Sequence, residues 1–340
     1  MESFITENRF QEITSKYNSL KPIIVVGDIG LDKYTFGEVR RISPEAPVPV
    51  LEVSREWLKL GLAANISHNL KTIGVESTLC GVVGNDKNAS TFEHLLEECG
   101  LKTWGLVRSS DRPTIFKERV TTDTQQICRI DYESTDSISP KTAKSVLRRV
   151  EDFAKDHGAL IIEDYAKGTL TEDLIQGLIK SFTERNTLVC VDPGRSTPPL
   201  WYRGATLLKP NKKEAIIMVS SLGYRETNVE SIAEILVEKL NLEKVVITLG
   251  GDGMGMIDTK SDGKFHHIPT VANEVFDVSG AGDTAISLLT ASLVAGATLP
   301  EAAWLGNCGS GVVVAKKGTA TVDLKELSEF YKRLAGKLQK

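Results

Sequence analysis

Short runs of apolar, mostly β-branched residues recur along this chain, and each run is too short to form a stable helix. The first is Pro22-Ile-Ile-Val-Val-Gly27. Similar runs lie at residues 159–162, 187–191 and 245–248. Such runs are typical of strands that are buried on both faces of a parallel sheet. Helical spacing of apolar residues lies between them, for example from Ile232 to Leu240 after the capping sequence Thr227-Asn-Val-Glu230. Strands that alternate with helices predict an α/β fold with a doubly wound, mostly parallel sheet.

Two segments interrupt this alternation. Residues 36–53 contain three prolines, which exclude a helix and confine strands to the edge of a sheet. Residues 112–131 are typical of two strands around the polar turn at residues 121–124. We therefore expect a small antiparallel sheet beside the main one, as a candidate lid. Residues 1–20 are polar and weakly patterned, so we expect an N-terminal extension or short helix before one domain over residues 21–335.

The composition is that of an ordinary globular enzyme, and it narrows the class of partner. The 340 residues include 41 Lys and Arg against 45 Asp and Glu, a formal net charge of −4. This balance gives no reason to expect a nucleic acid or an anionic membrane as a partner. No apolar run approaches the roughly 20 residues that cross a bilayer, and the first residues do not resemble a signal peptide. We therefore expect a cytoplasmic protein. The cysteines and histidines form no pattern of a protein metal cage.

The segment Asp277-Val-Ser-Gly-Ala-Gly-Asp283 carries the most specific chemical signal. Gly280, Ala281 and Gly282 precede small and apolar residues, which predicts a tight turn that opens a helix. Backbone amides at the start of a helix bind anions, and the Asp283 carboxylate can take a proton from an attacking hydroxyl. This combination fits phosphoryl transfer, which depends on positioning and on charge stabilisation. Taken alone, the motif fits equally well an aspartate that only caps a helix.

A second glycine-rich turn, Thr248-Leu-Gly-Gly-Asp-Gly253, directly follows a predicted strand. Such a turn can cradle the phosphates of a nucleotide, although a hairpin is the more common outcome for this pattern by itself. The sequence contains no G-x-x-x-x-G-K-[ST], which excludes a P-loop NTPase. The glycines near the first strand are also spaced wrongly for a Rossmann dinucleotide site.

Four motifs resemble, in order, those of the ribokinase/PfkB carbohydrate kinases, over about residues 22–325. They are Gly27–Asp32, Asn211–Glu214, Thr248–Gly253 and Asp277–Asp283. The resemblance implies a ribokinase-like fold and an ATP-dependent sugar kinase in which Asp283 is the general base. The amides of residues 280–282 would hold the phosphoryl group. ATP and Mg²⁺ are the implied cofactors, and many relatives also use K⁺.

The same resemblance implies roles for residues outside the catalytic turn. The sugar hydroxyls would contact Asp32, Gly61 and Asn65. The nucleotide would contact Asn211, Glu214, Thr248, Gly250, Gly251, Gly253 and Asn307. Glu214 would help to organise Mg²⁺ through water, and Asp277 would join the backbone after Val312 in a monovalent-cation site. Simpler alternatives stay open, because Asn65 could cap a helix and Asn211 with Glu214 could be an ordinary surface pair.

Within that family, the candidate lid resembles the D-glycero-β-D-manno-heptose 7-phosphate kinases. The matching segments are Arg41–Val50, Lys117–Arg119, Gln125–Gln126, Arg129–Asp131 and Asp164–Gly168. Known members phosphorylate the sugar at C1 to the 1,7-bisphosphate, on the path to ADP-heptose for the lipopolysaccharide core. A substrate phosphate needs cations. The matching segments supply Arg41, Lys117, Arg119, Arg129 and Lys167. A solvated strand face would explain Lys117 and Arg119 equally well.

Two departures from the family pattern bear on the function. Relatives commonly have two glycines before the sugar-binding asparagine, whereas this chain has Gly61-Leu62 before Ala63-Ala64-Asn65. A side chain at position 62 fills space that glycine leaves free, so a kinase for another sugar or sugar phosphate stays open. A binding regulator without turnover is a third, weaker alternative. The sequence also lacks the H-x-G-H motif of a fused nucleotidyltransferase, so we expect adenylyl transfer from a separate protein. Exposed lid strands often pair with a second subunit, which favours a homodimer.

Overall fold

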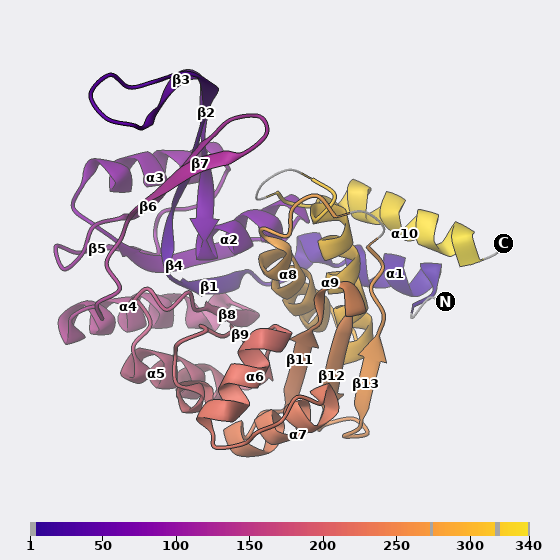
Figure 1. The fold of residues 1–340 in the computed structure, drawn as a ribbon. Helices are drawn as coiled ribbons and strands as arrows, with labels where there is room; N and C mark the ends of the chain where they lie inside the picture. The colour runs from indigo at the N-terminus through magenta and orange to yellow at the C-terminus, as the bar shows by residue number, and fades with distance from the viewer. Residues whose placement is uncertain (1–4, 273–274, 317–319, 339–340) are drawn as a thin grey trace.

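The computed structural model describes residues 5–272, 275–316 and 320–338, and its centre is a nine-stranded sheet (Figure 1). The strand order is β13-β12-β11-β10-β9-β8-β1-β4-β5. The strands are β1 (Ile23–Gly27), β4 (Ser77–Val83), β5 (Leu106–Arg108), β8 (Ala159–Glu163), β9 (Leu188–Asp192), β10 (Leu207–Leu208), β11 (Lys244–Thr248), β12 (Met254–Asp258) and β13 (Phe265–Ile268). The pairs from β5 to β11 are parallel, while β12 and β13 add antiparallel pairs at one edge. The predicted doubly wound, mostly parallel sheet is confirmed.

Successive residues of the central strands point to opposite faces of the sheet, and each face has its own apolar core. In β1, Ile23 and Val25 belong to one core, whereas Ile24 and Val26 belong to the other. All four are fully buried. Because these strands are buried on both faces, their sequences are continuous runs of apolar residues. Each such side chain contributes about 1.5–3 kcal/mol to the hydrophobic free energy of folding.

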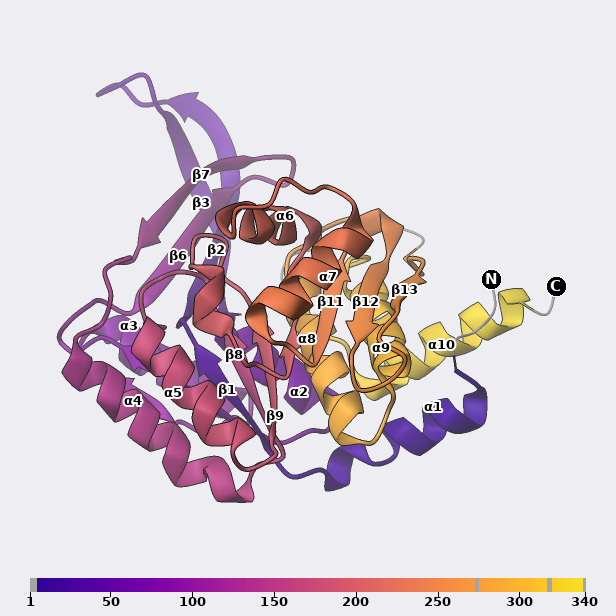
Figure 2. The ribbon, with the colours of Figure 1, turned by 90° about the horizontal axis from the view of Figure 1, so that it is seen from below.

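Helices cover both faces of the sheet (Figures 1 and 2). One core contains residues from α1 (Glu7–Thr14), α2 (Ala63–Thr72), α3 (Lys87–Glu98), α8 (Ala281–Val294), α9 (Leu299–Val313) and α10 (Leu324–Leu338). The other contains residues from α4 (Pro140–Phe153), α5 (Glu172–Thr183), α6 (Lys212–Ser221) and α7 (Val229–Leu240). The N-cap of α7 is Asn228, whose side chain accepts from Ser231 N. This helix therefore begins one residue later than the capping sequence Thr227–Glu230 predicts.

A second sheet, in the order β3-β2-β6-β7, stands off the main one as the lid (Figure 1). Its strands are β2 (Ile29–Ile42), β3 (Pro49–Leu62), β6 (Ile115–Thr121) and β7 (Gln126–Tyr132). They overlap the predicted segments 36–53 and 112–131, although β2 begins earlier and β3 ends later. The expectation of a purely antiparallel lid is wrong, because β2 pairs in parallel with β6. Both strands leave the main sheet at the carboxyl ends of parallel strands, so they run outward in the same direction.

The N-terminal segment packs onto the domain as helix α1. The ring of Phe10 is buried and stacks on Tyr331 of α10, with the ring centroids 4.5 Å apart. Arg9 donates to both carboxylate oxygens of Glu301, at 2.8 and 3.0 Å, in the first turn of α9. Residues that look like a polar extension in the sequence therefore contribute to the core. Among the helices that the structure describes, none is long and apolar enough to span a membrane.

Candidate active site

Asp283 lies in the first turn of α8, and only 7% of the residue is exposed. The preceding Gly280 has a φ of 81°, a left-handed conformation that favours glycine. Asn65 Nδ2 donates to Asp283 Oδ2 at 2.6 Å, and the Tyr165 hydroxyl donates to Oδ1 at 2.9 Å. Asn65 comes from the first turn of α2, and Tyr165 comes from the loop after β8. Three distant segments of the chain therefore meet at one carboxylate.

The surroundings of Asp283 make it a stronger base than a solvated aspartate. Burial raises the pKa of its carboxyl group, while the hydrogen bonds from Asn65 and Tyr165 lower the pKa again. The Asp192 carboxylate raises the same pKa, and the Lys209 ammonium lowers it. The balance leaves the pKa of Asp283 above its ordinary value. A raised pKa increases the proton affinity of the carboxylate, and the two donors keep its oxygens oriented.

A buried ion pair lies behind the catalytic turn. Lys209 Nζ is 2.6 Å from Asp192 Oδ2, and Lys209 is only 2% exposed. A Cβ atom added to Gly282 would lie 3.7 Å from Lys209 Nζ, so the ammonium lies close to the turn. Glu163 is also buried, and its Oε2 has no hydrogen-bond partner among the described residues. Burial, reinforced by neighbouring carboxylates, raises the pKa of Glu163 well above its ordinary value.

These four residues, Tyr165, Glu163, Asp192 and Lys209, were not among the predicted site residues. A usable signal exists in the sequence for three of them, because Glu163, Tyr165 and Asp192 lie just after the carboxyl ends of predicted strands, whereas Lys209 follows β10, which was not predicted. Open α/β sheets bind their ligands at that end. The position predicts proximity to a ligand, but it does not predict which side chains face one another.

A cavity of about 260 Å³ adjoins the catalytic turn. Its lining includes the four residues predicted to bind the nucleotide at the glycine-rich turn, Thr248, Gly250, Gly251 and Gly253, and also the predicted nucleotide contact Asn307. Ala281 and Gly282 also line it, so the cavity reaches the turn that carries Asp283. Among the described residues, no atom lies within 4 Å of a Cβ added to Gly250 or Gly251, so both glycines face open space. Several other lining residues are apolar, which suits a purine base.

Asn211 and Glu214 form a capping box at the start of α6. Asn211 Oδ1 accepts from Glu214 N at 3.0 Å, and Glu214 Oε2 accepts from Asn211 N at 2.8 Å. An isolated β-bridge joins Asn211 to Thr248, which places the pair beside the glycine-rich turn. The structural and the ligand-binding interpretations are therefore compatible. In the described part of the chain, no group of three or more His, Cys, Asp and Glu side chains could hold a metal ion alone.

The residues predicted to bind the sugar gather at the base of the lid. Asp32 on β2 and Gly61 on β3 lie side by side, and a Cβ added to Gly61 would be 2.8 Å from Asp32 Oδ2. Arg119 on β6 donates to Asp32 Oδ1 at 2.5 Å, and its guanidinium lies 5.2 Å from the centre of the Tyr34 ring. The charge of Asp32 is therefore already paired. A sugar hydroxyl at this point would meet both an acceptor and a cation.

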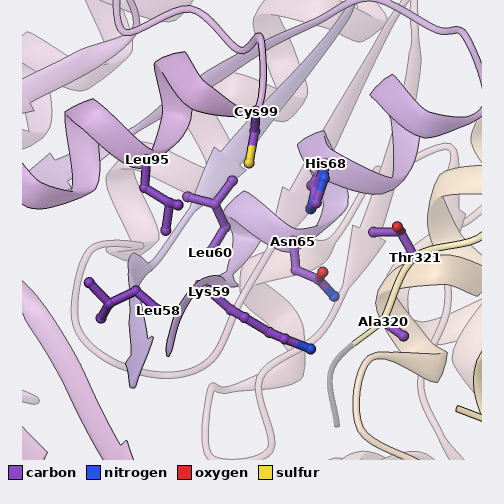
Figure 3. A pocket seen from close by; sticks show the side chains of 9 residues that line it. All are labelled: Leu58, Lys59, Leu60, Asn65, His68, Leu95, Cys99, Ala320 and Thr321. Carbon is purple, nitrogen blue, oxygen red and sulfur yellow. The ribbon is translucent and has the colours of Figure 1, made fainter. Parts of the chain in front are cut away.

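Two further cavities flank these residues. The larger, of about 510 Å³, lies under the lid. Its lining includes the rings of Tyr34, Phe36 and Trp57 and the cations Arg55, Lys59 and Arg119. The smaller, of about 220 Å³, lies between β3, α2 and α3 (Figure 3). Lys59 lines both cavities and Asn65 lines the smaller one, so the two spaces adjoin at the sugar residues.

Comparison with known proteins agrees with this geometry. The pfkB family of carbohydrate kinases matches residues 31–326. The chain belongs to this family. The bifunctional protein HldE of Citrifermentans bemidjiense is 40% identical over 304 residues, which are 89% of this chain and 62% of that protein. The kinase chain thus spans less than two thirds of the length of this relative.

Solved structures share the fold of the kinase. The ribokinase of Arabidopsis thaliana, solved with ribose and ATP, superposes with a TM-score of 0.70 at 19% identity, over 92% of this chain and 99% of that one. The phosphofructokinase-2 of Escherichia coli, solved with potassium, superposes with a TM-score of 0.76 at 17% identity, over 93% of this chain and 99% of that one. These likenesses establish a ribokinase-like fold. The family match identifies the chain as a carbohydrate kinase.

The kinase does not gather the five predicted cations into one cluster. Arg41 lies near the tip of the β2–β3 hairpin, opposite Val50, and is exposed. It lies nine positions beyond Asp32 on the same strand, about 30 Å away at the rise of an extended strand. A phosphate bound near Asp32 is therefore out of reach of Arg41 from the same chain.

The remaining predicted cations already have acidic partners. Lys117 and Lys167 both pair with Glu133, the former at 3.3 Å. Arg129 pairs with Asp131 at 2.7 Å on the exposed β7 strand. These pairs hold the lid and the loop after β8 together, because Lys117 belongs to β6 and Lys167 to that loop. A substrate phosphate would have to share or displace these partners.

Asp277 and the backbone after Val312, the predicted monovalent-cation residues, lie next to each other. The amides of Phe276 and Asp277 both donate to Val314 O, at 2.7 and 3.2 Å. Asp277 Oδ1 accepts from Ser279 N at 2.9 Å. The loop before α8 is therefore joined to the end of α9, beside the cavity at the glycine-rich turn.

Proposed function

We propose that this chain transfers the γ-phosphoryl group of ATP to the C1 hydroxyl of D-glycero-β-D-manno-heptose 7-phosphate. The product would be the 1,7-bisphosphate, on the path to ADP-heptose for lipopolysaccharide core. The observation that carries the chemistry is Asp283, which is held by Asn65 and Tyr165 between a nucleotide-sized cavity and the lid. The resemblance of the lid segments to heptose 7-phosphate kinases and the 40% identity to an HldE protein support the choice of sugar.

In the proposed reaction, Asp283 accepts the proton of the sugar hydroxyl as that oxygen attacks the phosphoryl group. The amides of Gly280, Ala281 and Gly282 stabilise the charge of the transferring group, because they open helix α8. The Lys209 ammonium lies against the same turn and adds a buried positive charge. Water exclusion by the lid would limit hydrolysis of ATP.

ATP fits the cavity beside the glycine-rich turn, where Gly250 and Gly251 leave room for phosphates and Asn307 lies among apolar neighbours. Mg²⁺ would neutralise charge on those phosphates. The described residues offer no complete set of ligands, so Glu214 and Asn211 would bind the ion through water. A monovalent cation at Asp277 would contact the same loop.

The substrate phosphate would lie in the cavity under the lid, where Arg55, Lys59 and Arg119 supply positive charge. The sugar hydroxyls would bind Asp32, the Gly61 backbone and Asn65. Further partners are proposed on physical grounds. The lid exposes large apolar side chains, which supports a homodimer through this sheet. The exposed residues are Val39, Ile42, Val48, Val53, Ile130 and Tyr132.

A kinase for a different sugar phosphate is the second candidate. One observation favours it, since Leu62 has a φ of 58° at a position where relatives commonly have glycine. The leucine side chain stands between the sugar residues Gly61 and Asn65 in the sequence. It can therefore change the space that the sugar ring occupies.

ADP release with a panel of sugars and sugar phosphates tests the proposal. We expect turnover with heptose 7-phosphate and little with unphosphorylated sugars. Asp283→Asn should lower kcat by about 10²–10⁴-fold, because it removes the general base. Asp262→Asn, on the exposed turn between β12 and β13, is the matched control and should behave as wild type. Activity confined to unphosphorylated sugars would exclude the heptose assignment, and a fully active Asp283→Asn variant would exclude the mechanism.

A further inference from the structure

The loop between β8 and α5 is held by a buried carboxylate that the proposed chemistry does not use. Asp28 is fully buried at the end of β1. Its Oδ2 accepts from the amides of Tyr165 and Lys167, at 3.2 and 3.0 Å, and its Oδ1 accepts from the amide of Thr169 at 3.1 Å. Three backbone donors to one buried anion form a strong, directional set of hydrogen bonds. One side chain therefore binds three backbone amides of this loop.

A buried cation holds the same loop from its other side. The guanidinium of Arg112 donates to the carbonyl oxygens of Lys167 and Ser134, and it also contacts Thr169 Oγ1 at 3.4 Å. The Asp28 charge is the largest favourable influence on Arg112, whose pKa is nevertheless lowered by burial. Backbone amides of the loop thus donate to Asp28, while backbone carbonyl oxygens accept hydrogen bonds from Arg112. Few polar groups of this loop are left to adopt another arrangement.

A second carboxylate holds the start of the loop. Asp164 Oδ1 accepts from Ala166 N at 2.6 Å, and its Oδ2 accepts from the hydroxyls of Tyr202 and Thr197, at 2.6 and 2.7 Å. Ala166 has a φ of 54°, a conformation that costs energy for any residue with a Cβ. This conformation turns the chain directly after Tyr165. The loop is thus kept in a strained shape that a free segment would leave.

These hydrogen bonds fix the position of the Tyr165 hydroxyl group. Tyr165 donates to Asp283 Oδ1 at 2.9 Å, while Asn65 donates to Oδ2. Burial raises the pKa of Tyr165 well above its ordinary value, so its hydroxyl remains protonated and acts only as a donor. A donor to each oxygen fixes the plane of the Asp283 carboxylate and leaves one further lone pair on each oxygen for the substrate.

We propose that Tyr165 is a positioning residue for the Asp283 base, and that the buried Asp28 carboxylate acts on the reaction through Tyr165. The proposal rests on the proposed role of Asp283 as base, but not on the identity of the sugar. Tyr165 does not exchange a proton with the substrate. It orients the carboxylate and stabilises its ionised form.

The charged groups around Asp283 predict the effect of removing this hydroxyl. Asp192 raises the pKa of Asp283, Lys209 lowers it, and Glu163 lies close enough for its own pKa to be raised by Asp283. Asn65 and Tyr165 are the two hydrogen-bond donors that lower the pKa of Asp283. Burial raises the pKa of Asp283, and each of these hydrogen bonds opposes that increase. Loss of one donor should therefore raise the pKa of Asp283 further. The acidic limb of the pH profile should therefore move to higher pH.

Tyr165→Phe tests this directly, because it removes only the hydroxyl. With the best acceptor of the panel, kcat should fall by about ten- to a hundredfold, the range expected for a hydrogen bond to a charged group. The KM values for sugar and ATP should change little, and the acidic limb should move to higher pH. Tyr17→Phe is the control, since Tyr17 is fully buried and its hydroxyl forms a hydrogen bond with Ser292 Oγ, away from Asp283. An unchanged kcat and pH profile in Tyr165→Phe would overturn the proposal.

A readout without substrate separates this proposal from the proposed function. The Asp283 carboxyl signal, labelled with ¹³C and assigned by its loss in Asp283→Asn, should titrate at higher pH in Tyr165→Phe than in wild type. If no sugar is turned over but the signal still moves, the positioning contact is real and the kinase assignment fails. If the signal does not move, the positioning contact is refuted whatever the substrate.

Asp28→Asn tests the second half of the proposal, because the amide cannot accept all three backbone donors. It should lower kcat and move the pH profile as Tyr165→Phe does. The double variant should be no worse than the more impaired single variant, since both act on one contact. Multiplicative losses would refute the link through Tyr165. If Asp28→Asn does not fold, Thr169→Pro, which removes one of the three donors, is measured in its place against the same two outcomes.

Discussion

At the scale of single residues, the candidate site of this kinase contains carboxylates that folding has largely removed from water. Asp283, Asp192 and Glu163 lie in one buried group, and burial is the largest cause of the raised pKa of each. One buried cation, Lys209, faces the group and pairs directly with Asp192. Three negative charges against one positive charge are unfavourable at close range, so part of the group must stay protonated.

Glu163 is the residue expected to keep that proton, and this predicts a pH-dependent stability. Its pKa is raised well above the ordinary value, chiefly by burial, so the folded protein binds a proton that the unfolded chain has released. The free energy of unfolding should therefore fall as the pH rises from the unfolded pKa through the folded one. Glu163→Gln removes this loss, so its Tm relative to wild type should increase from pH 5 to pH 8.

Calorimetric melts of both proteins across that pH range measure the effect. Glu230→Gln, on the exposed face of α7, is the matched control and should follow wild type at every pH. A constant difference in Tm between Glu163→Gln and wild type would mean that Glu163 is ionised in the folded protein.

At the scale of elements, the junction between β3 and α2 contains a backbone conformation that is unusual for a residue other than glycine. Leu62 caps α2 with φ 58° and ψ −141°, a region that glycine adopts far more easily than leucine. The sequence marks this position only as a departure from the family pattern. The structure adds the physical cost, because a β-carbon is present where the backbone turns from the lid into the helix.

Leu62→Gly should relieve that cost. The substitution removes about 1–3 kcal/mol of strain from the folded state. Glycine also has more conformational freedom in the unfolded chain, which lowers the free energy of unfolding by about 0.5–1 kcal/mol. We expect a net gain of about 1 kcal/mol in the free energy of unfolding by urea, with a change in the KM for the sugar. Asn241→Gly is the control, because Asn241 has φ 49° and ψ 54°, which asparagine tolerates. A less stable Leu62→Gly variant would show that packing of the leucine outweighs its strain.

In the lid, the sequence pattern predicts the strands but not their relative directions. The prolines of residues 43–49 exclude a helix, and the structure has a hairpin connection there, with Pro49 opening the edge strand β3. The strand directions in the lid could not be predicted, because the parallel pairing of β2 with β6 joins residues far apart in the sequence. Such pairing depends on where each strand leaves the main sheet, which local propensity does not encode.

At the scale of the whole molecule, the N-terminal helix is part of the same cooperative core. Phe10 is buried against Tyr331, so the two ends of the described chain pack together. Phe10→Ala should lower the free energy of unfolding by about 3 kcal/mol, the usual result of removing a buried ring. The kcat of the folded protein should not change. Urea unfolding measures this, with Gln11→Ala on the exposed face of α1 as the control. An unaffected midpoint would show that α1 docks without contributing to stability.

The candidate site was predictable where the chemistry is local. The turn at Gly280–Asp283 and the turn at Thr248–Gly253 are read from consecutive residues, and the structure places both around one cavity. The predicted group of cations is different. Lys117 and Lys167 share Glu133, and Arg41 lies at the far end of the lid. The pairing of Lys117 and Lys167 with an acidic residue depends on strand register and tertiary packing, which the composition of the sequence does not reveal.

The class of fold and the two glycine-rich turns of the candidate site were predictable from the sequence alone, because apolar periodicity and glycine-rich turns act over a few neighbouring residues. Only the tertiary structure decided what surrounds Asp283. Asn65, Tyr165 and Lys209 come from three separate segments. Tyr165 and Lys209 follow the carboxyl ends of the parallel strands β8 and β10, and the lid strand β3 leads into α2, which brings Asn65 to the same edge of the sheet. The burial that shifts the pKa of Asp283 also exists only after those segments have closed over it.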